Sequence, residues 1–457
     1  MAMRARLLSS FVLSAVVAAA ALAGSATAGA ATDCDRFAAT TGSDAGTGTL
    51  ESPYATAEML AASLGAGETG CFRAGSYGFA VLNVERPGIT LAPYGSEDVT
   101  LNGDVKVLPA GAGSTIEGLR LNGAAGEHQI GPRIYADGVI LRDNEITNQH
   151  TGICVTITSF DSESAPRGVV VERNRIHDCG RLPATNHDHG IYIAQGRGTI
   201  VRDNWIYSNA DRGIQQYPDT QGSLITGNVI DSNGQGVNFG GDDSNTNCSN
   251  DNIVEGNIIT DSRLRWNAYS GAQGKPCSGN VVRRNCVHAE PGDYEANGGI
   301  EPDSRSFDAS GNVTANPGFV APGSGDYRLQ ADSACLPTYT GAMSGPGASS
   351  PPGASPPPPA SGEGAAARVA LNVSRRLVPV GRRVRVRGSA SPVVVGARKV
   401  TIERRRHGRW RRAGQAAIRQ GGRFKDRVRV RGGRVVKLRA RVRGVGRSRV
   451  VRVRVRR

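Results

Sequence analysis

The chain has 457 residues, of which 39% are hydrophobic and 21% are charged. Apart from an apolar run at residues 7–23, no segment could cross a membrane, which excludes a protein with several membrane spans. The net charge of +15 is uneven, because residues 365–457 contain 29 Arg and 3 Lys against Glu403 and Asp426, giving +30 there and −15 elsewhere. This asymmetry favours a polyanion-binding part, although an excess of Arg over Lys of 50 to 5 is also compatible with genome composition.

Residues 1–28 are predicted to be a secretory signal peptide. Arg4 and Arg6 precede the apolar run, and the small residues Ala26-Thr27-Ala28 follow it. The run is rich in alanine and shorter than a typical membrane span, which favours export over a membrane anchor. We therefore expect a secreted, extracellular protein.

A short helix is predicted near the start of the exported chain. Ser52 can cap it, with Pro53 at its first position, and it would extend through Leu64. A helix here would cover the N-terminal end of a stack of strands, which otherwise exposes apolar rows and unpaired edges.

One residue type recurs at a nearly fixed interval. The spacings are 30, 30, 24, 29, 28 and 27 residues between Asn144, Asn174, Asn204, Asn228, Asn257, Asn285 and Asn312. In six of the seven, β-forming residues precede the Asn and Ile or Val follows two positions later. Such a period indicates stacked supersecondary units, here coils of short strands from about Gly88 to Phe319. Because Asn tolerates the left-handed conformation and its amide can bond to the next coil, we expect turns with a ladder of Asn side chains.

A second frame within the repeat is a Gly that begins another short strand, at Gly152, Gly190, Gly213 and Gly236. Alternation along these strands predicts that one set of side chains faces inward: Ile153, Ile191, Ile214 and Val237. It predicts that a second set faces outward and stacks from coil to coil: Cys154, Tyr192, Gln215 and Asn238. Tyr217 faces outward by the same alternation.

All eight cysteines lie in the repeat region, and in an exported protein they would form disulfides. Sequence alone leaves 105 pairings open. Pairing of nearest neighbours in coil order predicts Cys34–Cys71, Cys154–Cys179, Cys248–Cys277 and Cys286–Cys335. A zinc site is the alternative, but no Cys-x-x-Cys spacing exists.

Residues 341–365 are rich in Gly, Pro, Ser and Ala and are predicted to be a semi-extended linker. After the linker, residues 366–457 alternate Arg and Val, as in Arg383–Arg387, which is typical of half-buried strands in a small β-sandwich. Outward Arg rows would bind polyanions such as cell-wall polymers by charge. Specific nucleic acid binding is not expected, because aromatic residues for base stacking are nearly absent.

Roughly residues 40 to 337 resemble the right-handed parallel β-helices of the pectate-lyase-like superfamily. The Asn repeat carries this resemblance, together with the opening Gly42–Thr56 and the closing Asn316-Pro-Gly-Phe319 with Asp326-Tyr-Arg-Leu329. It implies an all-β fold, with a β-helix and N-terminal cap over residues 29–340. Residues 366–457 resemble the Ig-like or fibronectin-III-like modules that follow linkers in exported bacterial proteins.

The most distinctive local feature is Asn186-His187-Asp188-His189, directly before Gly190, with Arg212 taking the position of His189 one coil later. A His beside an Asp can act as a tuned proton acceptor, and Arg can bind a carboxylate through two hydrogen bonds. In a β-elimination, His187 or His189 would be the base, Arg212 would neutralise a uronate carboxylate, and Tyr192 would be the acid. The alternative is that the imidazoles only cap a loop or bond along the stack.

Three further outward residues, Gln215, Tyr217 and Asn238, are predicted to contact the substrate. The resemblance implies Ca²⁺ held by Asp or Glu, and Asp242 and Asp243 are the predicted ligands, with solvated loop acids as the alternative. Lyases of this superfamily also commonly use Lys or Arg as base. This β-helix departs from that pattern, because its only lysines, Lys106 and Lys275, lie in no recognisable motif.

The sequence therefore predicts a secreted, monomeric polysaccharide lyase-like protein that cleaves an acidic polysaccharide by β-elimination. Its basic C-terminal unit would hold it on an anionic cell-wall polymer. Two alternatives remain on the same scaffold, because one fold hosts several functions. One is a non-catalytic polysaccharide-binding or surface structural protein, and the other is a glycoside hydrolase or epimerase.

Overall fold

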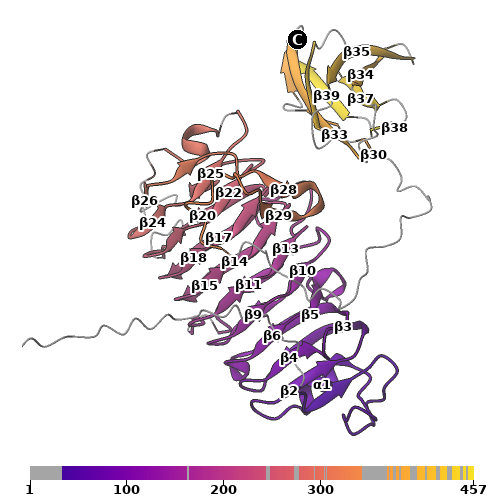
Figure 1. Cartoon of the computed structure of the whole chain (residues 1–457), viewed down its shortest axis with the longest axis vertical. Helices are drawn as coiled ribbons and strands as arrows, with labels where there is room; N and C mark the ends of the chain where they lie inside the picture. Colours follow the sequence, from indigo (N-terminus) through magenta and orange to yellow (C-terminus); the bar gives the residue numbers. More distant parts are fainter. Residues whose placement is uncertain are drawn as a thin grey trace, which may run out of the picture. The chain divides into compact units, whose positions relative to one another are not determined.

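The computed structural model describes residues 33–341 except 162–163, 243–246, 272–276, 293, 303 and 305, and segments of residues 368–456 (Figure 1). The predicted signal peptide and most of the predicted linker lie outside the described residues. The chain divides into two compact units between residues 352 and 353. No described helix is long and apolar enough to span a membrane.

The N-terminal unit is a stack of coils whose parallel strands form three faces (Figure 1). Face 1 consists of β1 (Arg36–Ala38), β2 (Thr69–Phe72), β4 (Thr90–Pro93), β6 (Thr115–Glu117), β9 (Ile140–Arg142), β12 (Val170–Glu172), β15 (Ile200–Arg202), β18 (Leu224–Thr226), β21 (Ile253–Glu255), β24 (Asn280–Arg283) and β26 (Phe307–Ser310). Face 2 consists of β7 (Arg120–Asn122), β10 (Glu145–Thr147), β13 (Arg175–His177), β16 (Trp205–Tyr207), β19 (Val229–Asp231), β22 (Ile258–Thr260), β25 (Cys286–His288) and β27 (Val313–Thr314).

Face 3 consists of β8 (Arg133–Ile134), β11 (Val155–Ile157), β14 (Ile191–Arg197), β17 (Arg212–Gln221), β20 (Gln235–Phe239) and β23 (Ala268–Ser270). The long strand β5 (Val99–Val107) pairs with β7 at one end and with β8 at the other, so it joins faces 2 and 3. The strand β3 (Gly75–Val84) pairs with β5 along most of its length.

Most strands of faces 1 and 2 have only three or four residues, and their central or alternate side chains point into the stack. Register pairing aligns these side chains in rows that are almost completely buried. The row of face 1 is Leu91, Ile116, Leu141, Val171, Val201, Ile225, Val254 and Val282. The row of face 2 is Leu101, Leu121, Ile146, Ile176, Ile206, Ile230, Ile259 and Val287. Burial of these branched side chains is the main source of stability.

All seven predicted Asn residues form the expected ladder at the corner between faces 1 and 2. Each of the first six Asn side chains donates to the Asn of the next coil, as Asn174 Nδ2 does to Asn204 Oδ1 at 3.0 Å. It also donates to a backbone carbonyl of the preceding coil, such as that of Leu141. One detail of the prediction is wrong, because the left-handed residue is the one before the Asn, for example Asp143 with φ 57°.

Shorter Asn ladders, which the sequence interpretation missed, lie at the other corners. Asn209 donates to Asn233 at 2.8 Å after face 2, and Asn252 donates to Asn280 at 2.9 Å before face 1. Each of these ladders joins only two Asn residues, so the interval does not recur often enough to form a visible repeat.

The predicted N-terminal helix exists, but it begins later than expected. It is α1 (Ala57–Ser63), and Thr56 caps it by accepting a hydrogen bond from the Met59 amide at 3.2 Å. Tyr54 instead forms a β-bridge with Ala38, which keeps the chain extended after Pro53. The buried side chain of Leu60 packs in the core at this end of the stack, as expected for a cap.

The segment after the last coil differs from the expected closing coil. The strands β28 (Phe319–Ala321) and β29 (Asp326–Leu329) form an antiparallel hairpin. The hairpin and the residues after it pack against the outer side of face 2 in a cluster comprising Trp205, Val229, Ile258, Cys286, Tyr327, Leu329 and Cys335. The sequence contains a signal for this cover of face 2. The residue after the ladder Asn is Glu145 or Arg175 in the first two coils, and it is one of the apolar residues of this cluster in the next four.

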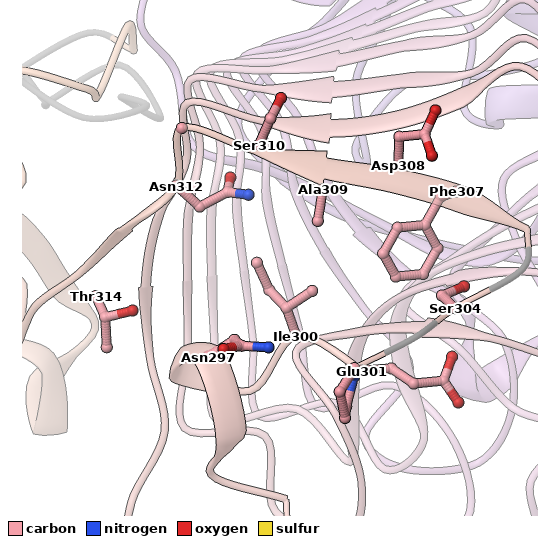
Figure 2. Close-up of a pocket in the computed structure, with 12 residues that line it drawn as sticks. Asn297, Ile300, Glu301, Ser304, Phe307, Asp308, Ala309, Ser310, Asn312 and Thr314 are labelled. Atoms are coloured by element: carbon pink, nitrogen blue, oxygen red, sulfur yellow. The ribbon is translucent and has the colours of Figure 1, made fainter.

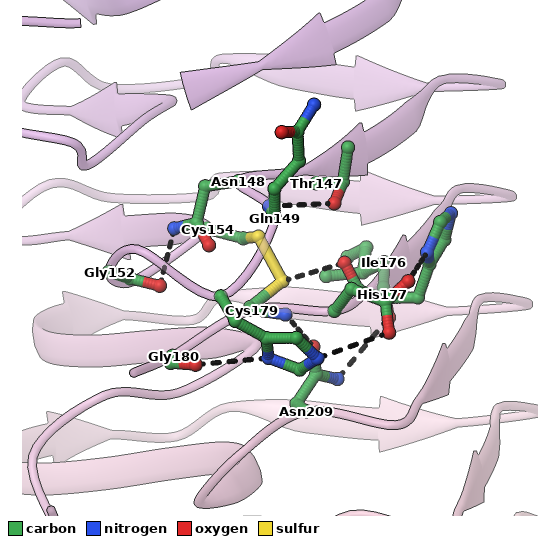
Figure 3. Close-up of a disulfide and its surroundings, with 12 residues drawn as sticks. Thr147, Asn148, Gln149, Gly152, Cys154, Ile176, His177, Cys179, Gly180 and Asn209 are labelled. Carbon is green, nitrogen blue, oxygen red and sulfur yellow. Dashed lines mark hydrogen bonds and ion pairs between the residues drawn. A yellow bond between two sulfur atoms is a disulfide. The ribbon is translucent and has the colours of Figure 1, made fainter. Parts of the chain in front are cut away.

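The four predicted disulfides are confirmed: Cys34–Cys71, Cys154–Cys179, Cys248–Cys277 and Cys286–Cys335. Figure 3 shows the Cys154–Cys179 bond, which joins the loop after β10 to the residues after β13. Both of its cysteines are fully buried, and the Cys154 amide donates to the His189 carbonyl at 3.2 Å. This disulfide therefore connects two coils at the start of face 3.

The C-terminal unit contains two small, mainly antiparallel sheets. The first consists of β30 (Arg368–Val369), β31 (Asn372–Val373), β33 (Arg383–Ser391) and β36 (Arg423–Arg429). The second consists of β32 (Leu377–Pro379), β34 (Lys399–Arg406), β35 (Arg409–Ala417), β37 (Val435–Val442), β38 (Gly446–Arg447) and β39 (Val451–Arg456). One apolar cluster, which includes Val386, Phe424, Ile402 and Leu438, contains residues of both sheets, as in the predicted sandwich. The Ig-like assignment stays a prediction.

Asn228→Ala should destabilise the stack strongly. Its side chain accepts from the Asn204 amide and Nδ2 and donates to Asn257 Oδ1 and the Val201 carbonyl, all buried. We expect the free energy of unfolding to fall by roughly 3 kcal/mol or more, because each unpaired buried group costs about 1–3 kcal/mol. Urea unfolding followed by circular dichroism measures this. Asn312→Ala, at the half-buried end of the ladder, should cost less than half as much, and equal losses would contradict the ladder's role.

Candidate functional site

The outer side of face 3 carries a row of polar and aromatic side chains. Register pairing aligns one outward residue from each successive coil: Arg133, Thr156, Tyr192, Gln215, Asn238 and Tyr269. The predicted alignment of Tyr192, Gln215 and Asn238 is confirmed by this register. Asn238 Nδ2 donates to Gln215 Oε1 at 3.0 Å, so neighbouring coils are also bonded through their outward side chains.

The predicted register of the first coil is wrong by two residues. Val155, rather than Ile153, pairs with Ile191, and Thr156, rather than Cys154, pairs with Tyr192. Cys154 is buried in its disulfide and Ile153 is only half-buried. The loop before β11 therefore contains two more residues than the frame of Gly152 suggested. Thr156 was missed as a member of the row for this reason, and Tyr269 was missed because no Gly precedes β23. Arg133 was missed although Gly131 lies at the register position of Gly190.

Arg212 lies at the start of β17 and is only 7% exposed. Its Nε donates to Gln235 Oε1 at 3.1 Å, and its two terminal nitrogens donate to the carbonyl and Oδ1 of Asn186 at 3.0 and 2.9 Å. These acceptors are neutral, and no carboxylate oxygen of the described residues lies within 4 Å of the guanidinium. Burial lowers the pKa of Arg212 to about 10. Arg212 is thus a buried cation without a contacting counter-charge.

His189 lies beside Arg212 and is 3% exposed. The register of Ile191 with Ile214 places the two residues at equivalent positions in successive coils, as predicted. Burial, together with the charge of Arg212, holds the pKa of His189 well below its usual value, so the ring is neutral at neutral pH. Its Nδ1 is buried and has no hydrogen-bond partner, and the ring meets that of Tyr192 edge to face at 5.4 Å.

Asp188 and His187 do not form the predicted acid–base pair with His189. The Asp188 carboxylate accepts from Arg181 Nε at 2.7 Å and Nη2 at 2.9 Å, and from Thr185 Oγ1. Burial opposes its ionisation, but these bonds outweigh burial and lower the pKa of Asp188. Asp188 therefore fixes the loop that leads to His189. His187 is exposed, and its charge would act on His189 from the loop.

Tyr192 and Tyr217 lie next to each other on the outer side of face 3. Burial, followed by the neighbouring Tyr217, raises the pKa of Tyr192 to about 12, so its hydroxyl keeps its proton. Several buried polar atoms along this surface have no partner: Thr156 Oγ1, His189 Nδ1, Gln235 Nε2 and Asn238 Oδ1. Buried polar groups are normally hydrogen-bonded, so these atoms are available to bond a ligand.

The predicted Ca²⁺ ligands do not form a complete site among the described residues. Asp242 accepts from Asn247 Nδ2 at 2.9 Å and so helps to close its own loop, and Asp243 lies outside the described residues. In the described part of the chain, no three His, Cys, Asp or Glu side chains group closely enough to hold a metal ion. The Ca²⁺ assignment stays a prediction.

A concavity of about 490 Å³ lies elsewhere, at the last coil (Figure 2). Phe307, Asp308 and Asn312 line it from β26 and the following turn, and Asn297 lines it from the short helix η3 (Ala296–Gly298). Glu301 also lines it, and the bridge between Ala268 and Ile300 places Glu301 next to Tyr269 in the outward row of face 3. Burial raises the pKa of Glu301. The outward row thus ends at a carboxyl group.

A second group of charged residues, not predicted from the sequence, lies on the outer side of face 2. The nitrogens of His177 (Figure 3) face Asp178 Oδ2 at 3.1 Å and Glu145 Oε1 at 3.3 Å, and the ring stacks on Tyr207. Burial alone would lower the pKa of His177, but the two carboxylates outweigh burial and raise it to about 9. His177 is therefore a structural cation at neutral pH rather than a proton acceptor.

Comparison with known proteins agrees with this architecture. A family model described as "Right handed beta helix region" matches residues 107–259. Among solved structures, the chain is similar to pectate lyase Pel9A, with a TM-score of 0.50 and 12% identity over 66% of this chain and 91% of that chain. The N-terminal unit is a right-handed parallel β-helix.

Two further structures have lower TM-scores. XylC in complex with xylose has a TM-score of 0.41 and 14% identity over 56% of this chain and 69% of that chain. A rhamnogalacturonan lyase has a TM-score of 0.39 and 11% identity over 63% of this chain and 90% of that chain. No curated protein matches the sequence. At these identities the similarity to solved structures concerns the fold alone.

The cation at His177 predicts a pH-dependent stability. The pKa of His177 in the folded protein, about 9, lies above the ordinary value of 6.5. The stability that the protonated ring contributes is therefore complete below pH 6.5 and is lost as the pH rises through 9. His177→Gln should flatten the fall in melting temperature between pH 6.5 and 9, measured by differential scanning calorimetry. His187→Gln, in an exposed loop, should leave the slope unchanged. The assignment is wrong if His177→Gln keeps the wild-type slope.

Proposed function

We propose that the protein is an extracellular polysaccharide lyase-like enzyme that cleaves an acidic polysaccharide on the outer side of face 3. The observation that carries this proposal is the buried guanidinium of Arg212, whose hydrogen bonds go only to neutral acceptors. A buried cation of this kind attracts an anion, and Arg binds carboxylates through a planar fork. A uronate carboxylate would supply the missing negative charge.

His189 is the base that fits best beside this cation. A base must be unprotonated before it acts, and burial next to Arg212 keeps the imidazole neutral. When a substrate carboxylate binds to Arg212, the cationic charge that suppresses the basicity of His189 is offset. The unpartnered Nδ1 can then accept the proton at C5. Substrate binding and base strength are coupled through the Arg212 charge.

The remaining predicted roles agree with this arrangement. Tyr192 keeps its phenolic proton because of its raised pKa, and its ring contacts that of His189, so it can protonate the leaving oxygen. Gln215, Asn238 and the missed Thr156 continue the row on both sides of Tyr192 and can bond sugar hydroxyls. Ca²⁺, if bound, would help to neutralise the uronate, and Asp242 is the described residue predicted to hold it.

A non-catalytic binding protein is the second candidate. It is favoured by the small exposure of His189, because a base must reach the substrate. Hydrolysis is less well supported, since a glycosidase needs two carboxyl groups flanking the bond. The outward row from Arg133 to Tyr269 contains no acid, and the two described carboxyl groups that line the concavity, Glu301 and Asp308, lie at the last coil, beyond the end of that row. The four disulfides support the proposal that the protein is exported. We also propose that the C-terminal unit retains the protein on an anionic wall polymer.

Incubation with pectate, alginate and glycosaminoglycans, with and without Ca²⁺, should release unsaturated ends that absorb ultraviolet light. Arg212→Gln should lower this rate by about 10²–10³-fold, as removal of a preorganised charge contact does. Arg202→Gln, a half-exposed position on face 1, should retain the wild-type rate. Absence of unsaturated ends on every polymer refutes the lyase. Reducing ends without that absorbance would show hydrolysis, and binding without turnover would show the non-catalytic alternative.

The pH dependence of kcat/KM tests the assigned base. The reaction needs neutral His189 and protonated Arg212, so the rate should fall only well below pH 6.5 and again as Arg212 loses its proton near pH 10. His189→Gln should abolish turnover with little change in polymer affinity, whereas His288→Gln on face 2 should retain the rate. An acidic limb centred at or above pH 6.5 would exclude His189 as the base.

A further inference from the structure

The strands β33 and β36 of the C-terminal unit place cations directly opposite one another. The antiparallel register pairs Arg383 with Arg429, Arg385 with Arg427 and Arg387 with Lys425. Val384, Phe424 and Val428 alternate with these residues and are buried in the shared core, so the described side chains of Arg383, Arg385, Lys425, Arg427 and Arg429 belong to the outer side of this sheet. Arg383, Lys425 and Arg427 are exposed, and Arg385 is half-buried. We call this outer side of β33 and β36 the cation ladder.

The two described acids of the C-terminal unit, Glu403 and Asp426, do not lie on the cation ladder. Asp426 alternates to the same side as Phe424 and Val428, towards Gly414 on the opposite sheet. Glu403 belongs to the opposite sheet and accepts from Arg439 Nε at 2.7 Å, and Arg439 also covers the Trp410 ring at 4.1 Å. The acids therefore stabilise the interior and the opposite sheet, and the cation ladder carries one sign of charge.

This arrangement is unfavourable for the unit alone. Like charges directly opposite each other on a sheet face, about 5 Å apart, repel and destabilise the pairing. Stable exposed faces usually mix both signs. Genome composition can explain why the cations are Arg rather than Lys, but not why acids are missing from this face. An external polyanion would relieve the repulsion.

We propose that the cation ladder binds the acidic polysaccharide on which face 3 acts, and so captures the polymer for the β-helix. This inference rests on the proposed function. Residues 1–364 carry a net charge of −15, which repels a polyanion, and residues 365–457 carry +30. Successive cations on one strand are about 7 Å apart, so a linear polymer with repeated carboxylates can contact several rows. Two linked binding sites raise the effective concentration of polymer at face 3.

The test uses the full chain and fluorescent polygalacturonate or alginate, with binding measured by anisotropy at several salt concentrations. The variant Arg383→Gln/Lys425→Gln/Arg427→Gln should lower polymer affinity at least tenfold and reduce the salt dependence. The matched control Lys399→Gln/Arg411→Gln/Arg454→Gln removes the same charge from exposed positions of the opposite sheet and should change affinity less than threefold. Equal losses in both variants would show a net-charge effect and overturn the proposal.

Three further measurements separate the possibilities. If the ladder variant loses binding to DNA or to a phosphodiester wall polymer but keeps binding to both polyuronates, the inferred partner is wrong. Turnover of a short oligouronate should be unchanged in the ladder variant, while KM for the polymer rises. Retained polymer binding by the wild-type chain with no turnover would overturn the lyase proposal and leave capture by the ladder intact.

Discussion

Hydrogen bonding between successive coils at the Asn corner is the constraint on which the structure depends. Asn174 accepts from both the amide and Nδ2 of Asn144 and donates to Asn204 and to the Leu141 carbonyl. The Asn174 side chain therefore bonds to three successive coils, and both its own oxygen and its own nitrogen are paired. A slip of one residue would break these bonds and turn the inward rows of faces 1 and 2 towards water. The register of every coil follows from this corner.

Face 3 has the same register, and this register holds Arg212 and His189 side by side although their proximity is electrostatically unfavourable. Arg212 and His189 occupy equivalent positions because Ile191 and Ile214 are paired, and neither residue can move away without disturbing the core. Asp188, held by Arg181, fixes the loop before His189, and the Cys154–Cys179 disulfide fixes the neighbouring coil, where the Cys154 amide donates to the His189 carbonyl. The rigid stack thus stabilises a buried cation that a flexible loop would expose to water.

The repeated features could be predicted from sequence, and the features that break the repeat could not. The Asn ladder, the four disulfides and the alignment of Tyr192, Gln215 and Asn238 follow from spacing that recurs. Cys154 was misplaced because Val155, the first inward residue of β11, lies three residues after Gly152, whereas Ile191, Ile214 and Val237 each follow their Gly directly. The role of Asp188 was misjudged because its partner, Arg181, is seven residues away in an irregular loop. The cover of face 2 by the hairpin β28–β29 was missed because its signal, the apolar residues that follow four of the ladder Asn residues, is a change within the repeat rather than a repeated spacing.

An acidic β-helix repels an acidic polymer, and the two units of the chain overcome this repulsion in different ways. An acidic β-helix that takes an acidic polymer needs local positive charge where the polymer reacts, and it needs positive charge at long range to bring the polymer near. Arg212 can meet the first need because its charge is buried, unscreened by water and held by neutral groups. It cannot meet the second, because a single charge in an acidic body attracts little beyond about 10 Å at physiological salt. The cation ladder, exposed and repeated, has the complementary properties. Separation of the two functions on two units allows the reacting site to stay buried while the capture surface stays open to solvent.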